Sequence, residues 1–381
     1  MVVFHTVEGV PANSCLLVDD AEQARRLPRG DLRLGFCGGC GFIANCAFSD
    51  DLPTYDATYE ETQGFSPRFR AFARELAQTW VDRYDLHGRR VLEVGCGKGE
   101  FLSLMAELGS NDCLGVDPAT DEDRVPVPAR GAVTVLPERY EPRHARPAVD
   151  AVVCRHTLEH VPDVSAFLRS LRAGAQDATV FLFELPDTTR VLREGALEDV
   201  YYEHCSYFTA GSLTRLFRRC GFTVLDLRLA YDGQYLVLEA RPGPEDTTMT
   251  EADVADVART AQDVEQFSQA FAATRGRWQD QLDRVQAAGR STVLWGGGSK
   301  AVAFLTTLGV AGAVRAVVDI NPHKQGKAMP ATGHPVVSPE SLLADPPDLV
   351  VVMNPVYAQE VRSLLADLGL TPEVVALGRP G

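Results

Sequence analysis

The apolar positions of this chain follow two patterns, one with helical spacing and one of short continuous runs. The segment SPRFRAFARELAQTWVDR repeats apolar residues at helical spacing over residues 66–83, which predicts a helix with Ser66 as N-cap and Pro67 at its first position. Next, RRVLEVGCGKGEFLSLMAELG predicts a strand, a glycine turn and a helix, and DCLGVD, VDAVVCRH and ATVFLFEL predict further buried strands. Apolar strands that alternate with helical segments are typical of parallel βαβ units.

A second unit of the same order is expected near the C-terminus. The polar, proline-containing stretch RPGPEDTTM predicts a linker around residues 242–250, and a long polar helix is expected from there to about residue 288. STVLWGGGSKAVAFLTTLG then predicts another strand, glycine turn and helix, with VRAVVDI and PDLVVVMN as more parallel strands. Residues 1 to about 50 are expected to be loop-like.

Length, composition and charge narrow the class of protein. A chain of 381 residues is too long for one ordinary core, and 45% hydrophobic with 23% charged residues is typical of a soluble globular protein. No apolar run approaches the ~18 residues of a membrane span, and the N-terminus does not resemble a signal peptide, so we expect a cytoplasmic protein without a membrane partner. Its nine cysteines are then expected to be reduced thiols. A net charge of −15 argues against a nucleic-acid partner.

The first glycine turn predicts a nucleoside-binding site. Gly95, Gly97 and Gly99 alternate after an apolar strand, which lets the backbone approach a ligand at the start of a helix. Asp117 ends the next strand, where a carboxylate meets a ribose diol in nucleotide-binding α/β folds. The third glycine of a dinucleotide fingerprint is absent, and Glu93 within the strand also suits another ligand. A chance glycine-rich turn that binds another nucleotide is the alternative.

This combination resembles motif I of class I S-adenosylmethionine-dependent methyltransferases. The resemblance implies that the glycine turn meets the methionine part and that the acid holds the ribose. The later stretch VVCRHTLEHVPD is similar to a common sequel in that superfamily, and it would place Arg155 and His156 at the rim of the cofactor pocket. His160 is expected only to cap or pack a helix.

The segment VYYEHCSYFT concentrates aromatic and ionisable side chains after a predicted strand end. In an extended chain Tyr202 and His204 share one face while Tyr201 and Glu203 share the other, so joint action needs a bend. A histidine is a suitable base for an activated proton near neutral pH. The alternative is an aromatic edge strand in which His204 only hydrogen-bonds the backbone.

The second glycine turn predicts a site for an anionic group. Gly296 to Gly298 precede Lys300 at a helix start, although the spacing is not that of a P-loop. Asp319 and Asn354 end the following strands, so they are expected at the same ligand-binding edge of a parallel sheet. The alternative is a degenerate nucleotide domain that is kept for packing.

The order of these motifs, together with the segment DINPHKQGKAMP, resembles the C-methyltransferases that act on nucleotide-linked keto-deoxysugars in secondary metabolism. The resemblance implies that His204 takes the proton next to the ketone, with Tyr201 and Glu203 orienting it or the enol oxygen, and that the substrate is contacted by Tyr202, Gly296, Gly298, Lys300 and Asn354. Family members usually carry two CxxC pairs that bind a structural zinc ion. This chain has only Cys37 and Cys40 as such a pair, with His5, Cys15 and Cys46 as further candidate ligands. It also has YDGQYLVLEA where the family typically has His-Gly-Gly-Ser.

We therefore expect an α/β protein with a class I methyltransferase Rossmann-like domain and a second Rossmann-like domain. The expected parts are a small cysteine-containing segment over residues 1–65, the methyltransferase domain over 66–242, a linker and long helix over 243–290, and a substrate-binding domain over 291–381. The expected reaction is C-methylation next to a ketone on a nucleotide-linked sugar or a related small metabolite, with S-adenosylmethionine as cofactor and with zinc as a further candidate. The alternatives are an O- or N-methyltransferase and a non-catalytic protein that binds S-adenosylmethionine or a nucleotide.

Overall fold

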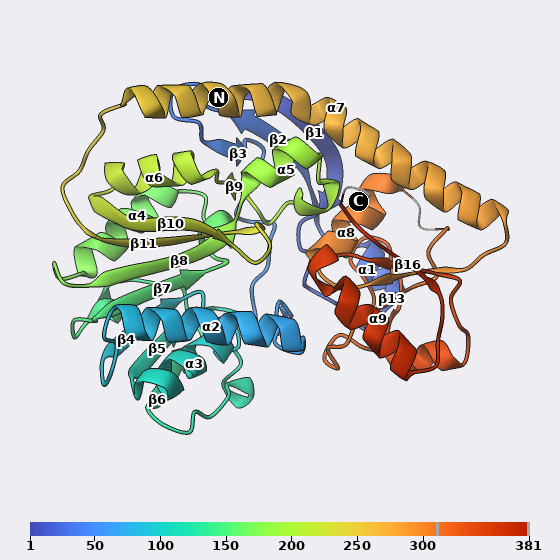
Figure 1. Cartoon of the computed structure of the whole chain (residues 1–381), viewed down its shortest axis with the longest axis horizontal. Coiled ribbons are helices and arrows are strands. Elements are labelled where there is room, and N and C mark those ends of the chain that lie inside the picture. The colour runs from blue at the N-terminus through green and yellow to red at the C-terminus, as the bar shows by residue number, and fades with distance from the viewer. Residues whose placement is uncertain (310–311, 379–381) are drawn as a thin grey trace.

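The computed structural model describes residues 1–309 and 312–378, so the expected end of the last domain at residue 381 lies outside the described residues. The described part of the chain contains three sheets, and one long helix, α7 (Glu251–Ala287), runs along them (Figure 1). The strand orders are β1-β2-β3-β9, β10-β11-β8-β7-β4-β5-β6 and β14-β13-β12-β15-β16.

The seven-stranded sheet is the centre of the first large domain. Its strands are β4 (Arg90–Val94), β5 (Asp112–Val116), β6 (Ala132–Leu136), β7 (Ala151–Arg155), β8 (Val180–Pro186), β10 (Phe222–Ala230) and β11 (Tyr235–Pro242). The first five strands pair in parallel, as expected, while β10 and β11 add an antiparallel edge. Helices α2 (Pro67–Arg83) and α3 (Glu100–Gly109) share a core with one face, and α4 (Val164–Gly174) and α6 (Ala210–Arg219) share one with the other.

The predicted start of α2 is confirmed. Ser66 is extended, and its hydroxyl accepts a hydrogen bond from the backbone N–H of Phe69. Pro67 follows at the first helical position, where its missing N–H costs no hydrogen bond. The apolar side chains at helical spacing, among them Ala73, Leu76 and Trp80, are buried.

The second large domain also has the predicted order. Its five-stranded parallel sheet and its helices are β12 (Thr292–Trp295), β13 (Ala316–Val318), β14 (Val336–Val337), β15 (Leu349–Val352), β16 (Glu373–Ala376), α8 (Ser299–Leu308) and α9 (Ala358–Asp367). The short 3-10 helices of the chain are η1 (Glu122–Arg124), η2 (Pro142–Ala145), η3 (Leu158–His160), η4 (Leu197–Asp199), η5 (Pro339–Leu343) and η6 (Pro355–Tyr357). Glycine turns connect β4 to α3 and β12 to α8, as expected.

The expectation that residues 1 to about 50 are loop-like is wrong. They form β1 (Val2–Pro11), α1 (Ala21–Arg25), β2 (Arg29–Phe36) and β3 (Ile43–Asn45), and the short β9 (Ser206–Tyr207) completes their sheet. Two register shifts interrupt the pairing of β1 with β2. Such irregularities disturb the alternation of side chains that identifies a strand in a sequence.

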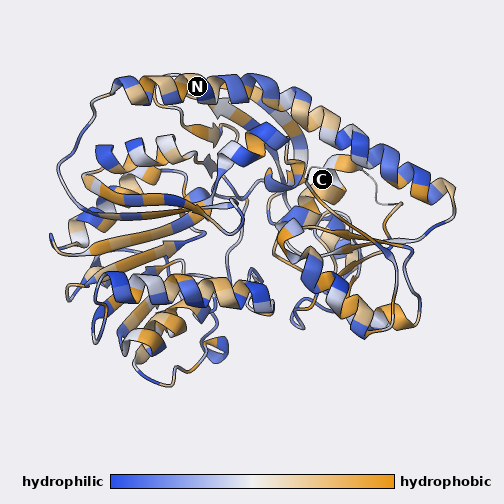
Figure 2. Ribbon diagram, in the orientation of Figure 1, coloured by the Kyte–Doolittle hydropathy of each residue, from blue (hydrophilic) through white to orange (hydrophobic). Residues whose placement is uncertain are grey.

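Helix α7 joins the small sheet to the C-terminal domain through one hydrophobic core. Polar and apolar residues are interspersed along this helix (Figure 2). Its buried apolar residues, which are three, four or seven positions apart, are Val257, Val264, Phe267, Phe271, Trp278, Leu282 and Val285. The same core contains Leu32 of β2, Tyr202 before β9, and Phe304 of α8. Over the described residues, the helices lack an apolar stretch long enough to cross a membrane.

A buried carboxylate fastens the end of α2 to the seven-stranded sheet. Glu239 of β11 is fully buried and accepts hydrogen bonds from the indole N–H of Trp80 at 3.0 Å and from the hydroxyl of Tyr84. The guanidinium groups of Arg83 and Arg228 approach its oxygens at 2.6 and 2.8 Å. Because the carboxylate has left water, its charge is tolerable only with these partners.

Removal of this carboxylate is expected to destabilise the fold. Glu239→Ala leaves the indole N–H of Trp80 without its partner and leaves Arg83 and Arg228 with Asp226 as their shared counter-charge. We expect it to lower the free energy of unfolding by about 2–4 kcal/mol, since both arginines also keep part of their contact with water. Glu75→Ala, on the exposed side of α2, should change it by less than about 0.5 kcal/mol. Urea denaturation measures both. Equal effects of the two substitutions would contradict this role.

Candidate functional site

The two glycine turns line one cavity. It has a volume of about 670 Å³ and lies at the carboxyl edges of the two parallel sheets, with further walls from the N-terminal segment and from the loop before β9. The lining residues from the two turns and the acids that follow them are Gly95, Gly97, Asp117, Gly296, Gly298 and Asp319. Ligands of open α/β sheets bind at this edge.

The geometry of the first turn explains its glycines. Gly95 has a φ of +75°, and a β-carbon there would lie 1.9 Å from the hydroxyl oxygen of Thr157. The backbone N–H of Gly97 donates to Oδ2 of Asp117 at 2.8 Å, and that of Ala119 donates to Oδ1 at 2.7 Å. The turn and the acid therefore fix each other's position beside the cavity.

The second turn repeats this arrangement. The backbone N–H of Gly297 donates to Oδ2 of Asp319 at 2.6 Å, and the N–H of Asn321 donates to Oδ1 at 2.8 Å. Asp319 lines the cavity, as Asp117 does. The chain thus presents two similar turn-and-acid arrangements to a single space.

Glu93 gives the first turn an available acidic group. Its side chain is 2% exposed, it lines the cavity, and within the described residues its Oε2 has no hydrogen-bond partner. Burial raises the pKa of Glu93 to about 8. An unpartnered carboxyl group beside a glycine cradle fits the ammonium group of an amino-acid-bearing cofactor such as S-adenosylmethionine.

Arg155 and His156 also line the cavity, but Glu184 holds both. Arg155 contacts the two carboxylate oxygens of Glu184 at 3.2 Å each and lies 4.0 Å above the ring of Phe101. Nε2 of His156 lies 2.7 Å from Glu184. Burial alone would lower the pKa of His156, but its contacts with Glu159 and Glu184 raise it to about 9, so this ring is positively charged at neutral pH.

The YYEH segment contains the bend that joint action requires. Only Ser206–Tyr207 is extended, and the turn before it brings the hydroxyl of Tyr201 to 2.8 Å from Nε2 of His204. Both side chains line the cavity. Burial, together with the nearby His160, lowers the pKa of His204 to about 3, so its imidazole is neutral at pH 7.

Two residues of this segment face away from the cavity, which corrects their predicted roles. Tyr202 is fully buried in the core shared with α7, where it stacks on Phe48 and accepts a hydrogen bond from the backbone of Ser49, so it is not placed to bind substrate. Glu203 is 1% exposed and accepts hydrogen bonds from Asn13 and Ser14, so it does not orient His204. The bend that joins Tyr201 to His204 turns these two residues toward the scaffold.

Several cavity residues were missed by the sequence analysis. His160, expected only to pack, lines the cavity with Nδ1 3.0 Å from the hydroxyl of Tyr55 and its ring 5.0 Å from that of His204. The available signal was its place in the loop that follows β7, which ends at Arg155 at the carboxyl edge of the sheet. Burial raises the pKa of Glu61, another lining residue, to about 7. Tyr55 and Glu61 lie outside regular elements, so periodicity could not identify them.

At the second turn, side chains of the first domain hold the predicted substrate residues. Lys300 forms an ion pair with Asp199, which offsets the lysine's positive charge. The side-chain oxygen of Asn354 accepts a hydrogen bond from Gln234 at 2.9 Å. Gln234 belongs to the YDGQ stretch that departs from the resembled family, so this stretch helps to close the cavity against the second domain.

The predicted zinc site does not fit the donors that are present. Cys37 and Cys40 lie in one turn, but neither belongs to a group of three metal-binding side chains among the described residues. His5 packs against the rings of Phe267 and Phe271, while Cys15 lies beside Ser299 at the cavity and Cys46 is exposed. A structural zinc site needs four ligands, and this pair lacks two.

Comparison with known proteins supports a methyltransferase. A methyltransferase domain family matches residues 66–227, and a family described as the C-methyltransferase C-terminal domain matches residues 239–369. The C-methyltransferase NovU of Streptomyces niveus is 29% identical over 76% of this chain and 72% of its own. A ubiquinone biosynthesis O-methyltransferase of Pseudomonas entomophila is 30% identical over 25% of this chain and 44% of its own. An S-adenosylmethionine-dependent methyltransferase structure from Mesorhizobium loti aligns with 44% of this chain and 99% of its own at 18% identity and a TM-score of 0.34.

The position of Asp117 predicts a role in cofactor affinity. Asp117→Ala removes the acid that positions the turn and that would hold a ribose. The charge-assisted hydrogen bonds lost are worth about 1.5–3 kcal/mol, so affinity for S-adenosylmethionine should fall by tens of fold. Asp112→Ala, at the exposed start of the same strand, is the matched control and should leave affinity unchanged. Calorimetry that finds equal affinities would rule out this assignment.

Glu203 is expected to affect stability and not cofactor affinity. Glu203→Ala leaves Asn13 and the backbone N–H of Ser14 without a buried acceptor, which should lower the free energy of unfolding by about 1–3 kcal/mol. The variant should still bind S-adenosylmethionine with the parent affinity below its melting transition. Urea denaturation measures the stability and calorimetry measures the affinity. Unchanged stability with weakened cofactor binding would instead indicate that Glu203 acts in the site.

Proposed function

We propose that the chain uses S-adenosylmethionine to methylate a carbon next to a ketone, because residues 66–227 match a methyltransferase domain family and residues 239–369 match a C-methyltransferase C-terminal domain family. The substrate is a nucleotide-linked sugar or a related small metabolite. The observation that carries this proposal is the shared cavity, onto which both turn-and-acid arrangements open. One arrangement suits the cofactor, and the other suits the nucleoside or phosphate part of a second ligand.

At the first turn the chain's own groups bind and orient the cofactor. The turn at Gly95 leaves room for close approach, Asp117 offers a carboxylate to a ribose diol, and Glu93 offers its carboxyl group to an ammonium group. S-adenosylmethionine supplies a methyl group on a positively charged sulfur, which a carbon nucleophile can attack.

His204 is the proposed base. Its neutral imidazole lines the cavity, and the hydroxyl of Tyr201 at 2.8 Å holds the ring. Removal of the proton next to a ketone leaves a carbon nucleophile whose negative charge rests largely on the ketone oxygen, so a donor or cation near that oxygen is required as well. The lowered pKa of His204 makes it a weak base, which increases that requirement.

C-methylation is preferred to O-methylation because of how far each similarity extends. The match to NovU covers 76% of this chain, whereas that to the O-methyltransferase of P. entomophila covers 25%. The larger match supports a reaction in which the C-terminal domain takes part.

Replacement of His204 tests the proposed base. His204→Asn should abolish exchange of the substrate's α-proton with deuterated solvent and lower turnover by 10²–10⁴-fold, while cofactor affinity stays near that of the parent protein. His87→Asn, at an exposed position, is the control. NMR of the products from a panel of nucleotide-linked keto-sugars measures exchange and identifies the methylated atom. Exchange and turnover within a few-fold of the parent protein would exclude His204 as the base.

A further inference from the structure

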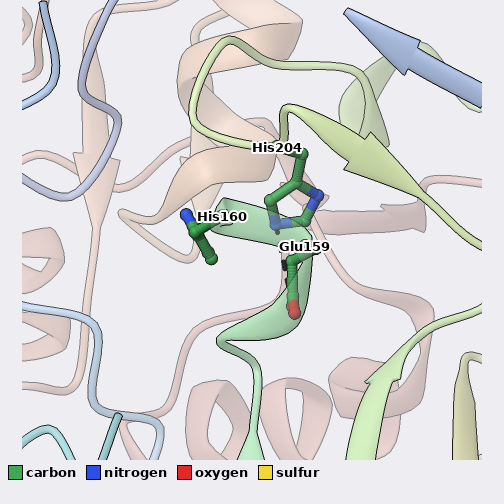
Figure 3. Close-up of side chains that lie close together, drawn as sticks. All are labelled: Glu159, His160 and His204. Carbon is green, nitrogen blue, oxygen red and sulfur yellow. Dashed lines mark ion pairs between the residues drawn. The ribbon is translucent and has the colours of Figure 1, made fainter. Parts of the chain in front are cut away.

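Three side chains of types that bind metal ions lie close together in the wall of the cavity. Glu159 and His160 come from η3, and His204 comes from the loop before β9 (Figure 3). One donor atom from each lies within 4.8 Å of the others, and all three residues line the cavity. The segments that supply them are far apart in the sequence, so the fold itself assembles the group.

The carboxylate of this group lacks hydrogen bonds. Glu159 is 2% exposed, and within the described residues neither of its side-chain oxygens has a hydrogen-bond partner. Its nearest cationic or basic atoms are Nδ1 of His156 at 3.6 Å and Nε2 of His204 at 4.0 Å, both too long for hydrogen bonds. A buried carboxylate in this state is costly unless another partner is present.

We propose that Glu159, His160 and His204 bind one divalent transition-metal ion, with zinc as the first candidate. Two imidazoles and a carboxylate are a ligand set of catalytic zinc and non-haem iron sites, which keep at least one position open. Because all three side chains line the cavity, the open position faces the space where a substrate would bind.

The surroundings of the histidines suit this assignment. Nδ1 of His160 is engaged by the hydroxyl of Tyr55 at 3.0 Å, which orients the ring and leaves Nε2 for an ion. Nε2 of His204 contacts the hydroxyl of Tyr201, which has to release it. Bonds of about 2.0–2.2 Å to an ion require the donor atoms to approach each other by roughly 1 Å, which side-chain rotation can supply.

Positively charged groups lie next to the proposed ion. Glu184 contacts both His156 at 2.7 Å and Arg155 at 3.2 Å, so its single negative charge does not offset both. Glu159 lies 3.6 Å from Nδ1 of His156, so an ion would compete with His156 for this carboxylate.

A bound ion would supply one group that the proposed reaction lacks and would take away the proposed base. A ketone oxygen at the ion's open position would be polarised, and the negative charge that develops there would be stabilised. A coordinated nitrogen cannot accept a proton, so His204 is a ligand and not a base while an ion is bound there. This consequence rests on the proposed function, whereas binding of the ion does not.

Titration with metal tests the site in the absence of cofactor and substrate. The full chain carrying Cys37→Ser and Cys40→Ser, which removes the thiol pair as a competing site, is freed of metal with a chelator and titrated calorimetrically with Zn²⁺. We expect one ion per chain, and at least a tenfold loss of affinity on adding either His160→Asn or Glu159→Gln. His87→Asn is the matched control and should leave binding unchanged.

Absence of Zn²⁺ binding to the double cysteine variant would overturn the proposal. Binding that His160→Asn leaves undiminished would overturn it too, since the ion would then be adventitious. His160 is only half-buried, so this variant decides the matter if the substitution of buried Glu159 impairs folding, and melting curves verify the fold. Because no methyl transfer is measured, failure here stays separate from failure of the proposed function, which proton exchange tests.

Discussion

One hydrophobic core, shared by the N-terminal sheet, helix α7 and the C-terminal domain, holds the two glycine turns on opposite walls of one cavity. Phe267 of α7 and Phe304 of α8 are fully buried in it, and so is Leu32 of β2. Each parallel sheet alone would present a ligand edge to solvent. Helix α7 has 37 residues and is about 55 Å long, so it can pack against both the N-terminal sheet and the C-terminal domain and hold the two sheet edges at one cavity.

The same core explains why the YYEH segment has two functions. Tyr201 and His204 line the cavity, while Tyr202 lies in the core and Glu203 bonds the N-terminal segment. The hydroxyl of Ser14, which donates to Glu203, lies 3.0 Å from the hydroxyl of Ser299 at the start of α8. The segment that carries the proposed base is therefore tied to both of the other parts of the chain.

Local patterns in the sequence predicted the elements whose structure depends on neighbouring residues. The spacing of apolar residues identified α2, and the glycine turn after β4 was recognised because its residues are contiguous. The N-terminal sheet was not predicted, because bulges break the alternation of side chains in β1 and because β3 pairs with β9, some 160 residues later in the chain. The ion pair of Lys300 was not predicted for a similar reason, since Asp199 comes from a segment about 100 residues earlier in the chain. The orientation of Tyr202 and Glu203 depends on a bend whose angle the sequence does not specify.

Charge is distributed unevenly around the cavity. Glu61 of the N-terminal segment and Glu93 and Glu159 of the first domain line the cavity, and within the described residues each has at least one side-chain oxygen without a hydrogen bond. Lys300 and Lys324 line the wall of the C-terminal domain, each beside an aspartate. Unpartnered carboxyl groups favour cations, whereas lysines at a glycine turn favour anions. A ligand with a phosphate at one end is therefore expected to place that end on the C-terminal domain. Its reacting carbon would then lie between the first glycine turn and His204.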